Sequence, residues 1–221
     1  MSISGVPPTE FTRPVADSQS LKEIYDLLFD GWKMVIIEPN MPSKNLENNI
    51  TWRFYDAIVA EKSRFIDDGT RQYCFSFHSG EGVTDGKGNQ TGIADMIVQF
   101  GTDERNRFII EAKLLNKQRA SNAGAYVGKD GMGRFMSGKK YGIGVSEGGM
   151  MGYVLDGNTA KARKSVTDKI ETERQTLGMS PTETLKNSTV HDDVYETSHV
   201  RQTGTPFTIY HLFLPVVPHQ N

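Results

Sequence analysis

The segment 107–115, with the sequence RFIIEAKLL, constrains the fold more than any other part of the chain. Side chains of a β-strand alternate between its two faces, so one face would carry Phe108, Ile110, Ala112 and Leu114. The other face would carry Ile109, Glu111, Lys113 and Leu115. A carboxylate and an ammonium group therefore lie about 6–7 Å apart on one face of an otherwise apolar strand. We expect a core strand with a charged pair at its centre.

A second apolar run, residues 93–100, precedes this strand and is joined to it by the turn sequence GTDERN. A hairpin centred on Asp103 pairs residues whose numbers sum to 206, which places Asp95 opposite Glu111. Their Cβ atoms would then lie roughly 4.5–5.5 Å apart, an arrangement that destabilises a sheet when the two charges are alike. A shift of one residue in this register would move Asp95 to the other face.

Two interpretations of these charges remain open. Carboxylate oxygens are the preferred ligands of Mg²⁺ and Mn²⁺, so a divalent metal would explain why two acids meet between core strands. Alternatively, Glu111 and Lys113 form a simple ion pair at a sheet edge while Asp95 is solvated.

The remaining hydrophobic patterns predict an α/β fold built around one central mixed sheet flanked by helices. Helices are expected at 21–28, from Ser43 or Asn45 to just before Gly69, around 134–141 and from Asn158 or Thr159 to about 177. Strands are expected at 35–37, 73–77, 93–100, 107–115, 150–155 and 207–217. Loops are expected at 79–91 and 178–205, and residues 1–20 are expected to form a loosely ordered arm. We divide the chain into an N-terminal arm with a short helix, 1–42, and a main domain, 43–221.

Composition excludes several classes of protein. The 221 residues are 37% hydrophobic and 24% charged, which is ordinary for a globular domain. No apolar run approaches 18 residues and the N-terminus does not resemble a secretory signal, so we expect neither a membrane span nor a signal peptide. Cys74 is the only cysteine, which excludes an internal disulfide and a cysteine-rich zinc site, and from this we expect a reducing, cytoplasmic location. His191 with Asp192 and Asp193 is a weaker candidate metal cluster.

Positive charge is concentrated in one segment. Residues 111–175 carry 12 Lys and Arg against 7 Asp and Glu, although the whole chain has a net charge of −2. A local positive field of this kind can hold a polyanion. The candidate contacts to nucleic acid are Lys117, Arg119, Lys161, Arg163 and Lys164. The alternative is that these side chains are solvated faces of helices and loops.

The segment 124–152 contains ten glycines together with Arg134, Lys139 and Lys140. It is either a basic flap over bound nucleic acid or a surface loop.

Asp95, fifteen intervening residues and Glu111-Ala112-Lys113 resemble the signature of the PD-(D/E)XK nucleases, the restriction-endonuclease-like superfamily. The preceding helix, the strand meander and the later helix and strand are similar to the core order of that superfamily. Ala94 stands where the family usually has the proline that precedes the first acid. The resemblance implies a restriction-endonuclease-like core.

For individual residues, the resemblance implies a metal-dependent catalytic site. Asp95 and Glu111 would hold one or two Mg²⁺ or Mn²⁺ ions, and the Ala112 carbonyl would complete the coordination. Lys113 would position or activate the attacking water. Many members add a glutamate from the first core helix, for which Glu47 fits by position. The alternative for Glu47 is a carboxylate placed at a helix start, where the helix dipole favours it.

The function that follows from the resemblance is Mg²⁺-dependent hydrolysis of phosphodiester bonds in DNA. Because the chain is small and slightly acidic, we expect it to act as a homodimer or as the effector subunit of a bacterial defence or restriction system. Two alternatives stay open. The protein is a catalytically silent interaction subunit of a multi-protein complex, or its substrate is RNA or branched DNA.

Overall fold

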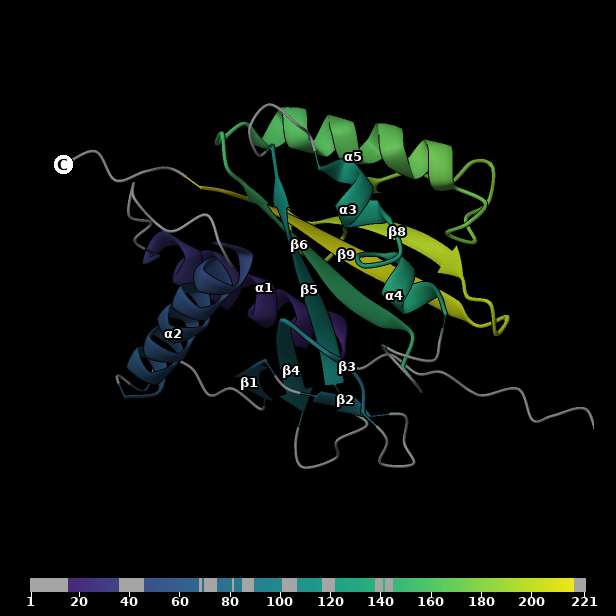
Figure 1. Ribbon diagram of the computed structural model, residues 1–221. Helices are drawn as coiled ribbons and strands as arrows, with labels where there is room; N and C mark the ends of the chain where they lie inside the picture. Colours follow the sequence, from purple (N-terminus) through teal and green to yellow (C-terminus); the bar gives the residue numbers. More distant parts are fainter. Residues whose placement is uncertain are drawn as a thin grey trace, which may run out of the picture.

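The central sheet has seven strands in the order β1-β4-β5-β6-β9-β8-β7 (Figure 1). The computed structural model describes residues 16–35, 46–67, 69, 75–80, 82–84, 90–100, 107–116, 122–137, 141 and 145–216. The strands of the sheet are β1 (Phe75–Ser79), β4 (Met96–Phe100), β5 (Arg107–Leu115), β6 (Glu147–Val154), β7 (Lys186–Asn187), β8 (Tyr195–Val200) and β9 (Pro206–Pro215). The predicted α/β class with a mixed sheet and flanking helices is confirmed.

The middle of the sheet is parallel and its two sides are antiparallel. Strand β5 pairs parallel to β6, and β6 pairs parallel to β9. Strands β1, β4 and β5 form an antiparallel meander on one side, and β9, β8 and β7 form a second one on the other. The connections between parallel strands cross over through helices, as such pairs require.

Helices cover both faces of the sheet (Figure 1). One hydrophobic cluster joins the sheet to α1 (Ser18–Lys33) and α2 (Leu46–Asp67). The other joins it to α3 (Ala123–Val127), α4 (Gly133–Met136) and α5 (Thr159–Glu173). None of the helices in the described residues is both long and apolar enough to cross a membrane.

Helix α1 is longer than the prediction of 21–28, and its first residues lie in the segment predicted as an arm. The reason is the N-cap: the Asp17 carboxylate accepts a hydrogen bond from the Ser20 amide at 2.7 Å, and this starts the helix earlier. At its other end, Trp32 donates to the carbonyl of Pro215 in β9. The division at residue 42 and the predicted strand residues 36–37 lie outside the described residues.

Two predicted loops contain strands. Residues 79–91 include β2 (Gly82–Thr84), which pairs with β3 (Gln90–Ile93) as a small separate sheet. Residues 178–205 include β7 and β8. Strand β8 was missed because its buried face carries Thr197 and His199 in place of apolar residues, so the segment has no hydrophobic period.

The glycine-dense segment is folded where the structure describes it. A Cβ atom on Gly131 would lie 2.0 Å from the carbonyl oxygen of Tyr126, so only glycine fits the turn between α3 and α4. A Cβ atom on Gly148 of β6 would lie 2.7 Å from the Phe135 ring. The missing side chain makes room for Phe135, which is fully buried and seats α4 on the sheet. The short helix predicted at 134–141 is confirmed only as far as Met136.

A buried polar chain, here called the histidine network, runs through the core beneath α3. It consists of Tyr126, Thr197, His199 and His211, all of which are buried. His199 Nδ1 lies 2.9 Å from the carbonyl oxygen of Leu177, which can only accept, so Nδ1 donates and Nε2 accepts from the Thr197 hydroxyl. Thr197 then accepts from His211 Nε2 at 2.8 Å, and His211 Nδ1 accepts from the Tyr126 hydroxyl at 3.1 Å.

Each N–H and O–H group of the histidine network therefore has one assigned acceptor, and both imidazoles are neutral. Burial lowers the pKa of His199 to about 4 and lowers that of His211 well below its ordinary value. The network contributes a uniquely ordered core with no charge in it.

Candidate functional site

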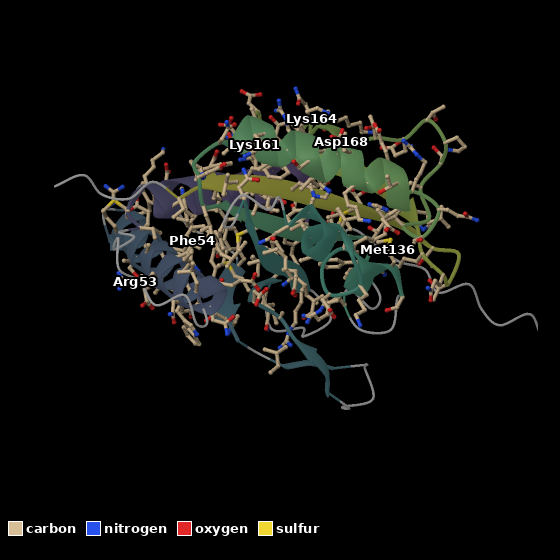
Figure 2. The ribbon with its side chains drawn as sticks, turned by 45° about the horizontal axis from the view of Figure 1, so that its top comes forward. Arg53, Phe54, Met136, Lys161, Lys164 and Asp168 are labelled. Carbon is tan, nitrogen blue, oxygen red and sulfur yellow. The ribbon has the colours of Figure 1, made fainter. Side chains whose placement is uncertain are left out.

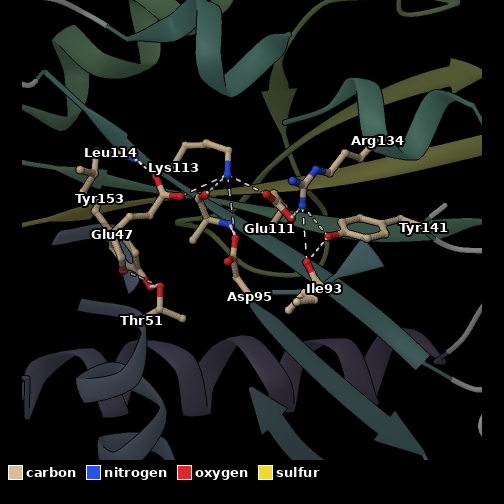
Figure 3. Close-up of polar contacts among 11 residues, drawn as sticks. Glu47, Thr51, Ile93, Asp95, Glu111, Lys113, Leu114, Arg134, Tyr141 and Tyr153 are labelled. Carbon is tan, nitrogen blue, oxygen red and sulfur yellow. Dashed lines mark hydrogen bonds and ion pairs between the residues drawn. The ribbon is translucent and has the colours of Figure 1, made fainter. Parts of the chain in front are cut away.

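The site begins where strand β5 extends past its neighbour β4. The four described pairs, from Met96–Ile110 to Gln99–Arg107, have the predicted register, in which residue numbers sum to 206. Asp95 lies one residue before β4, so its carboxylate turns to the free edge of β5 and accepts a hydrogen bond from the Ala112 amide at 2.7 Å (Figure 3). Asp95 is thus not simply solvated.

Glu47 occupies the next place along the same edge. It lies in the first turn of α2, and its Oε2 accepts from the Leu114 amide at 3.0 Å. Two carboxylates from distant parts of the chain therefore replace the hydrogen bonds that a longer β4 would make to β5. The contact of Glu47 with β5 goes beyond a role at its own helix start.

The ammonium group of Lys113 lies among four oxygens at this edge (Figure 3). Its Nζ is 2.6 Å from Glu111 Oε1, 2.6 Å from the Ala112 carbonyl oxygen, 3.3 Å from Glu47 Oε1 and 4.0 Å from Asp95 Oδ2. Burial opposes the charged form of Lys113, but Glu111, Glu47 and Asp95 together raise its pKa above the ordinary value. The same oxygens that sequence reasoning assigned to a metal thus surround a protein cation.

Glu111 is the most deeply buried of these acids, with a side chain only 1% exposed. The predicted ion pair with Lys113 is present, and Arg134 of α4 contacts the other carboxylate oxygen, with Nη1 3.0 Å from Oε2. Burial raises the pKa of the Glu111 carboxyl to about 7, and the Asp95 carboxylate adds to the rise, against the opposing influence of Lys113 and Arg134. Two neighbouring cations thus do not offset the burial of this carboxylate.

We call this group, Glu47, Asp95, Glu111, Lys113 and Arg134, the carboxylate cluster. It holds three carboxylates and two cations, so one negative charge is in excess when all are ionised. Within the described residues no three histidine, cysteine, aspartate or glutamate side chains converge closely enough to hold a metal ion directly. The donor chemistry nevertheless fits Mg²⁺ or Mn²⁺, because every donor is a hard oxygen and the set already surrounds a cation.

The predicted contacts to nucleic acid on α5 do not share one face. Buried Ala162 separates Lys161 from Arg163 on the helix surface. Arg163 donates to the Tyr195 hydroxyl and lies over that ring, whereas Lys161 and Lys164 extend away from the sheet (Figure 2). Predicted contacts Lys117 and Arg119 lie outside the described residues.

Lys161 is the one of these three cations that the structure connects to β5. It pairs with Asp156 at 3.4 Å, and Asp156 accepts a hydrogen bond from Asn116, directly after β5, at 2.8 Å. Lys164 instead pairs with Asp168 on its own helix at 2.8 Å.

Two residues of the site, Arg134 and Tyr141, were not in the predicted catalytic set. Arg134 Nη1 donates to the Tyr141 hydroxyl at 2.6 Å, and Tyr141 donates to the carbonyl of Ile93 (Figure 3). The only signal for them in the sequence was a basic residue in a glycine-dense segment, which does not say where the segment packs.

The second candidate metal cluster has another explanation. His191 stacks on the Phe29 ring with centroids 4.7 Å apart, and its Nε2 lies 3.6 Å from Asp26.

Comparison of the whole chain with family models, with curated proteins and with solved structures gave no match.

Proposed function

We propose that this protein is a Mg²⁺- or Mn²⁺-dependent nuclease with a restriction-endonuclease-like core that hydrolyses phosphodiester bonds in DNA. One observation carries the proposal: four oxygens from Glu47, Asp95, Glu111 and the Ala112 carbonyl surround a single cation at the open edge of β5. These donors come from α2, the residue before β4 and the middle of β5, which is the order that the resemblance implies.

The residues of the cluster have distinct roles in this proposal. Asp95, Glu111 and the Ala112 carbonyl hold the metal ion, with Glu47 as a further ligand. A bound Mg²⁺ supplies a water of lowered pKa and neutralises charge on the phosphate. Lys113 leaves the centre of the oxygens and donates to the attacking water or to a phosphate oxygen. Its ammonium group then opposes the negative charge that develops during hydrolysis.

Removing a carboxylate is the direct test of this site. Calorimetric titration of the purified protein with Mn²⁺ should give binding that is lost in Asp95→Asn and in Glu111→Gln. Asp168→Asn is a matched control, because Asp168 also pairs with a lysine but lies on the exposed side of α5. Equal Mn²⁺ binding by the wild type and both cluster variants would contradict the metal assignment.

The activity itself is tested by nicking of supercoiled plasmid with Mg²⁺. Because the chain has a net charge of −2, we propose that it works as the effector subunit of a defence or restriction system, or as a homodimer. The isolated protein should then nick slowly, and the Asp95→Asn variant not at all. Vigorous degradation that depends on Asp95 would support the nuclease and contradict the need for a partner.

A further inference from the structure

The backbone around Arg134 is held in place by packing and by a hydrogen bond. Phe135, the next residue, is buried between the rings of Phe207 and Tyr141, with centroids 5.6 and 5.5 Å away. The carbonyl of Met136 accepts a hydrogen bond from the Gln202 amide at 3.1 Å, which ties the end of α4 to the turn before β9. The direction of the Arg134 side chain is therefore set by packing on both sides of it.

Tyr141 orients the guanidinium group itself. The only proton of the phenol is donated to the Ile93 carbonyl, so its oxygen can only accept from Arg134. The guanidinium carbon also lies 5.4 Å from the centroid of the Tyr141 ring. Tyr141 is completely buried and thus acts as a fixed support.

In the described part of the chain, the Arg134 side chain makes its hydrogen bonds through one nitrogen. Nη1 donates to Glu111 at 3.0 Å and to Tyr141 at 2.6 Å, and lies 3.5 Å from the Ile93 carbonyl oxygen. Within the described residues Nε and Nη2 have no hydrogen-bond partner, and the side chain is 29% exposed. The edge of the guanidinium that suits a phosphate or carboxylate is therefore unoccupied by the described part of the chain.

The free edge of the Arg134 guanidinium belongs to the same cluster as the Lys113 ammonium group. Arg134 contacts Glu111 Oε2, and Lys113 contacts Glu111 Oε1, so the two cations lie on either side of one carboxylate (Figure 3). An anion that approaches the cluster from solvent meets both of them. Because Glu111 needs only one nitrogen of Arg134, the arginine can hold Glu111 and an incoming anion together.

We propose that Arg134 binds a non-bridging oxygen of the substrate phosphodiester through Nε and Nη2, while Nη1 holds Glu111 and Tyr141 fixes its orientation. The inference rests on the proposed function and specifies how that site recognises its substrate. Arg134 is then a catalytic residue, and Tyr141 is a positioning residue.

The test is the salt dependence of binding to a fluorescent 20-base-pair duplex, measured with Ca²⁺ in place of Mg²⁺. Loss of one phosphate contact should reduce the slope of log K against log salt by about 0.9 in Arg134→Gln and weaken binding about five- to tenfold. Arg134→Lys should restore the slope, because it keeps the charge. Cleavage by Arg134→Lys should still fall at least about tenfold, because an ammonium group cannot reproduce the guanidinium fork.

Two further variants separate orientation from general loss of charge. Tyr141→Phe should weaken duplex binding less than Arg134→Gln does. Arg64→Gln is the matched control and should change nothing, since Arg64 also pairs with a glutamate, Glu61, but lies about 26 Å along α2 from Glu47.

Mn²⁺ affinity distinguishes the possible failures. If Arg134 binds phosphate, Arg134→Gln should bind Mn²⁺ as tightly as the wild type or more tightly. An unchanged salt slope would overturn the inference, and if Mn²⁺ binding were lost as well, Arg134 would only orient Glu111. Failure of the proposed function differs again: the wild type would bind neither Mn²⁺ nor the duplex, and the inference would fall with it.

Discussion

The carboxylate cluster and the histidine network lie in one row of the sheet and are built on opposite principles. Glu111 of β5 is level with Met150 of β6, which is level with His211 of β9. The two titratable groups are thus two strands, or about 10 Å, apart. Both side chains are almost completely buried. Met150 lies between them, and its carbonyl oxygen is 3.3 Å from the hydroxyl oxygen of Tyr126.

The two clusters differ in how completely their polar groups are paired and in whether they carry charge. In the histidine network each ring nitrogen has one partner and neither imidazole carries a charge. In the carboxylate cluster like charges converge, one negative charge is in excess, and the pKa of Glu111 rises to about 7. A buried network in which every polar group has a hydrogen-bond partner gives a core one defined arrangement. Groups with strongly shifted pKa values, in contrast, are concentrated at functional sites. This comparison supports our proposal that the carboxylate cluster is a functional site, whereas the histidine network is structural.

The largest effect should follow the loss of Lys113. Lys113→Met removes the ammonium that occupies the four oxygens, so cleavage should fall about 10²- to 10⁴-fold while Mn²⁺ binding is kept or becomes tighter. Lys113→Arg should not restore cleavage, since a planar fork does not replace a compact ammonium. Single-turnover cleavage and calorimetry measure the two quantities. Full activity in Lys113→Met would contradict a catalytic role for the carboxylate cluster.

Stability should respond in the opposite sense at the two ends of the row. His211→Leu removes one hydrogen-bond partner from the Thr197 hydroxyl and one from the Tyr126 hydroxyl and should lower the free energy of unfolding by about 2–4 kcal/mol. Glu111→Gln removes a carboxylate that burial disfavours, so at pH 8.5 it should raise that free energy by about 1–3 kcal/mol. Urea titrations of both variants measure this contrast. A strongly destabilised Glu111→Gln would show that the cluster is structural after all.

The pH dependence of stability should show the two clusters opposing each other, with two buried histidines against one buried carboxyl group. The folded pKa of His199 is about 4, below the unfolded value near 6.5, so the unfolded chain binds more protons in that range and stability falls as pH drops. The folded pKa of Glu111 is about 7, above the unfolded value of 4.5, so stability falls as pH rises through that range.

Between about pH 4.5 and 6.5 the Glu111 carboxyl should offset the contribution of one of the two buried histidines, so the urea midpoint of the wild type should rise only gently with pH, apart from other groups. Glu111→Gln should uncover the full contribution of the histidine network, with a midpoint that rises more steeply toward pH 6.5. A flat profile in that variant would mean that the buried histidines do not remain neutral.

Sequence patterns predicted the centre of the fold well and its polar strand badly. The strand 107–115 and its register with β4 followed from alternation and hairpin symmetry, which depend only on local geometry. Strand β8 was assigned to a loop, because the burial of Thr197 and His199 depends on contacts to His211 and Leu177, which lie 14 and 22 residues away in the sequence. A buried polar face has the same sequence pattern as a solvated one.

The same limit applies to the site. Asp95, Glu111 and Lys113 were predictable because two neighbouring strands carry them, and Glu47 followed from a resemblance. Arg134 and Tyr141 join the site through the packing of Phe135 against β6, where Gly148 makes room for its ring. That fit depends on the shape of the assembled core, and no spacing in the sequence encodes it.

The smallest predicted effect concerns the positive charge on α5. Lys161 is connected to the end of β5 through Asp156 and Asn116, whereas Lys164 is 76% exposed and pairs with Asp168 on its own helix. If DNA approaches the open edge of β5, Lys161→Gln should weaken duplex binding about two- to fivefold and reduce the salt slope by about 0.9, while Lys164→Gln should leave both nearly unchanged. Anisotropy titrations at several salt concentrations measure both, with Mn²⁺ affinity as the control that neither variant should alter. Equal losses in the two variants would place the DNA along the outer face of α5, away from the carboxylate cluster.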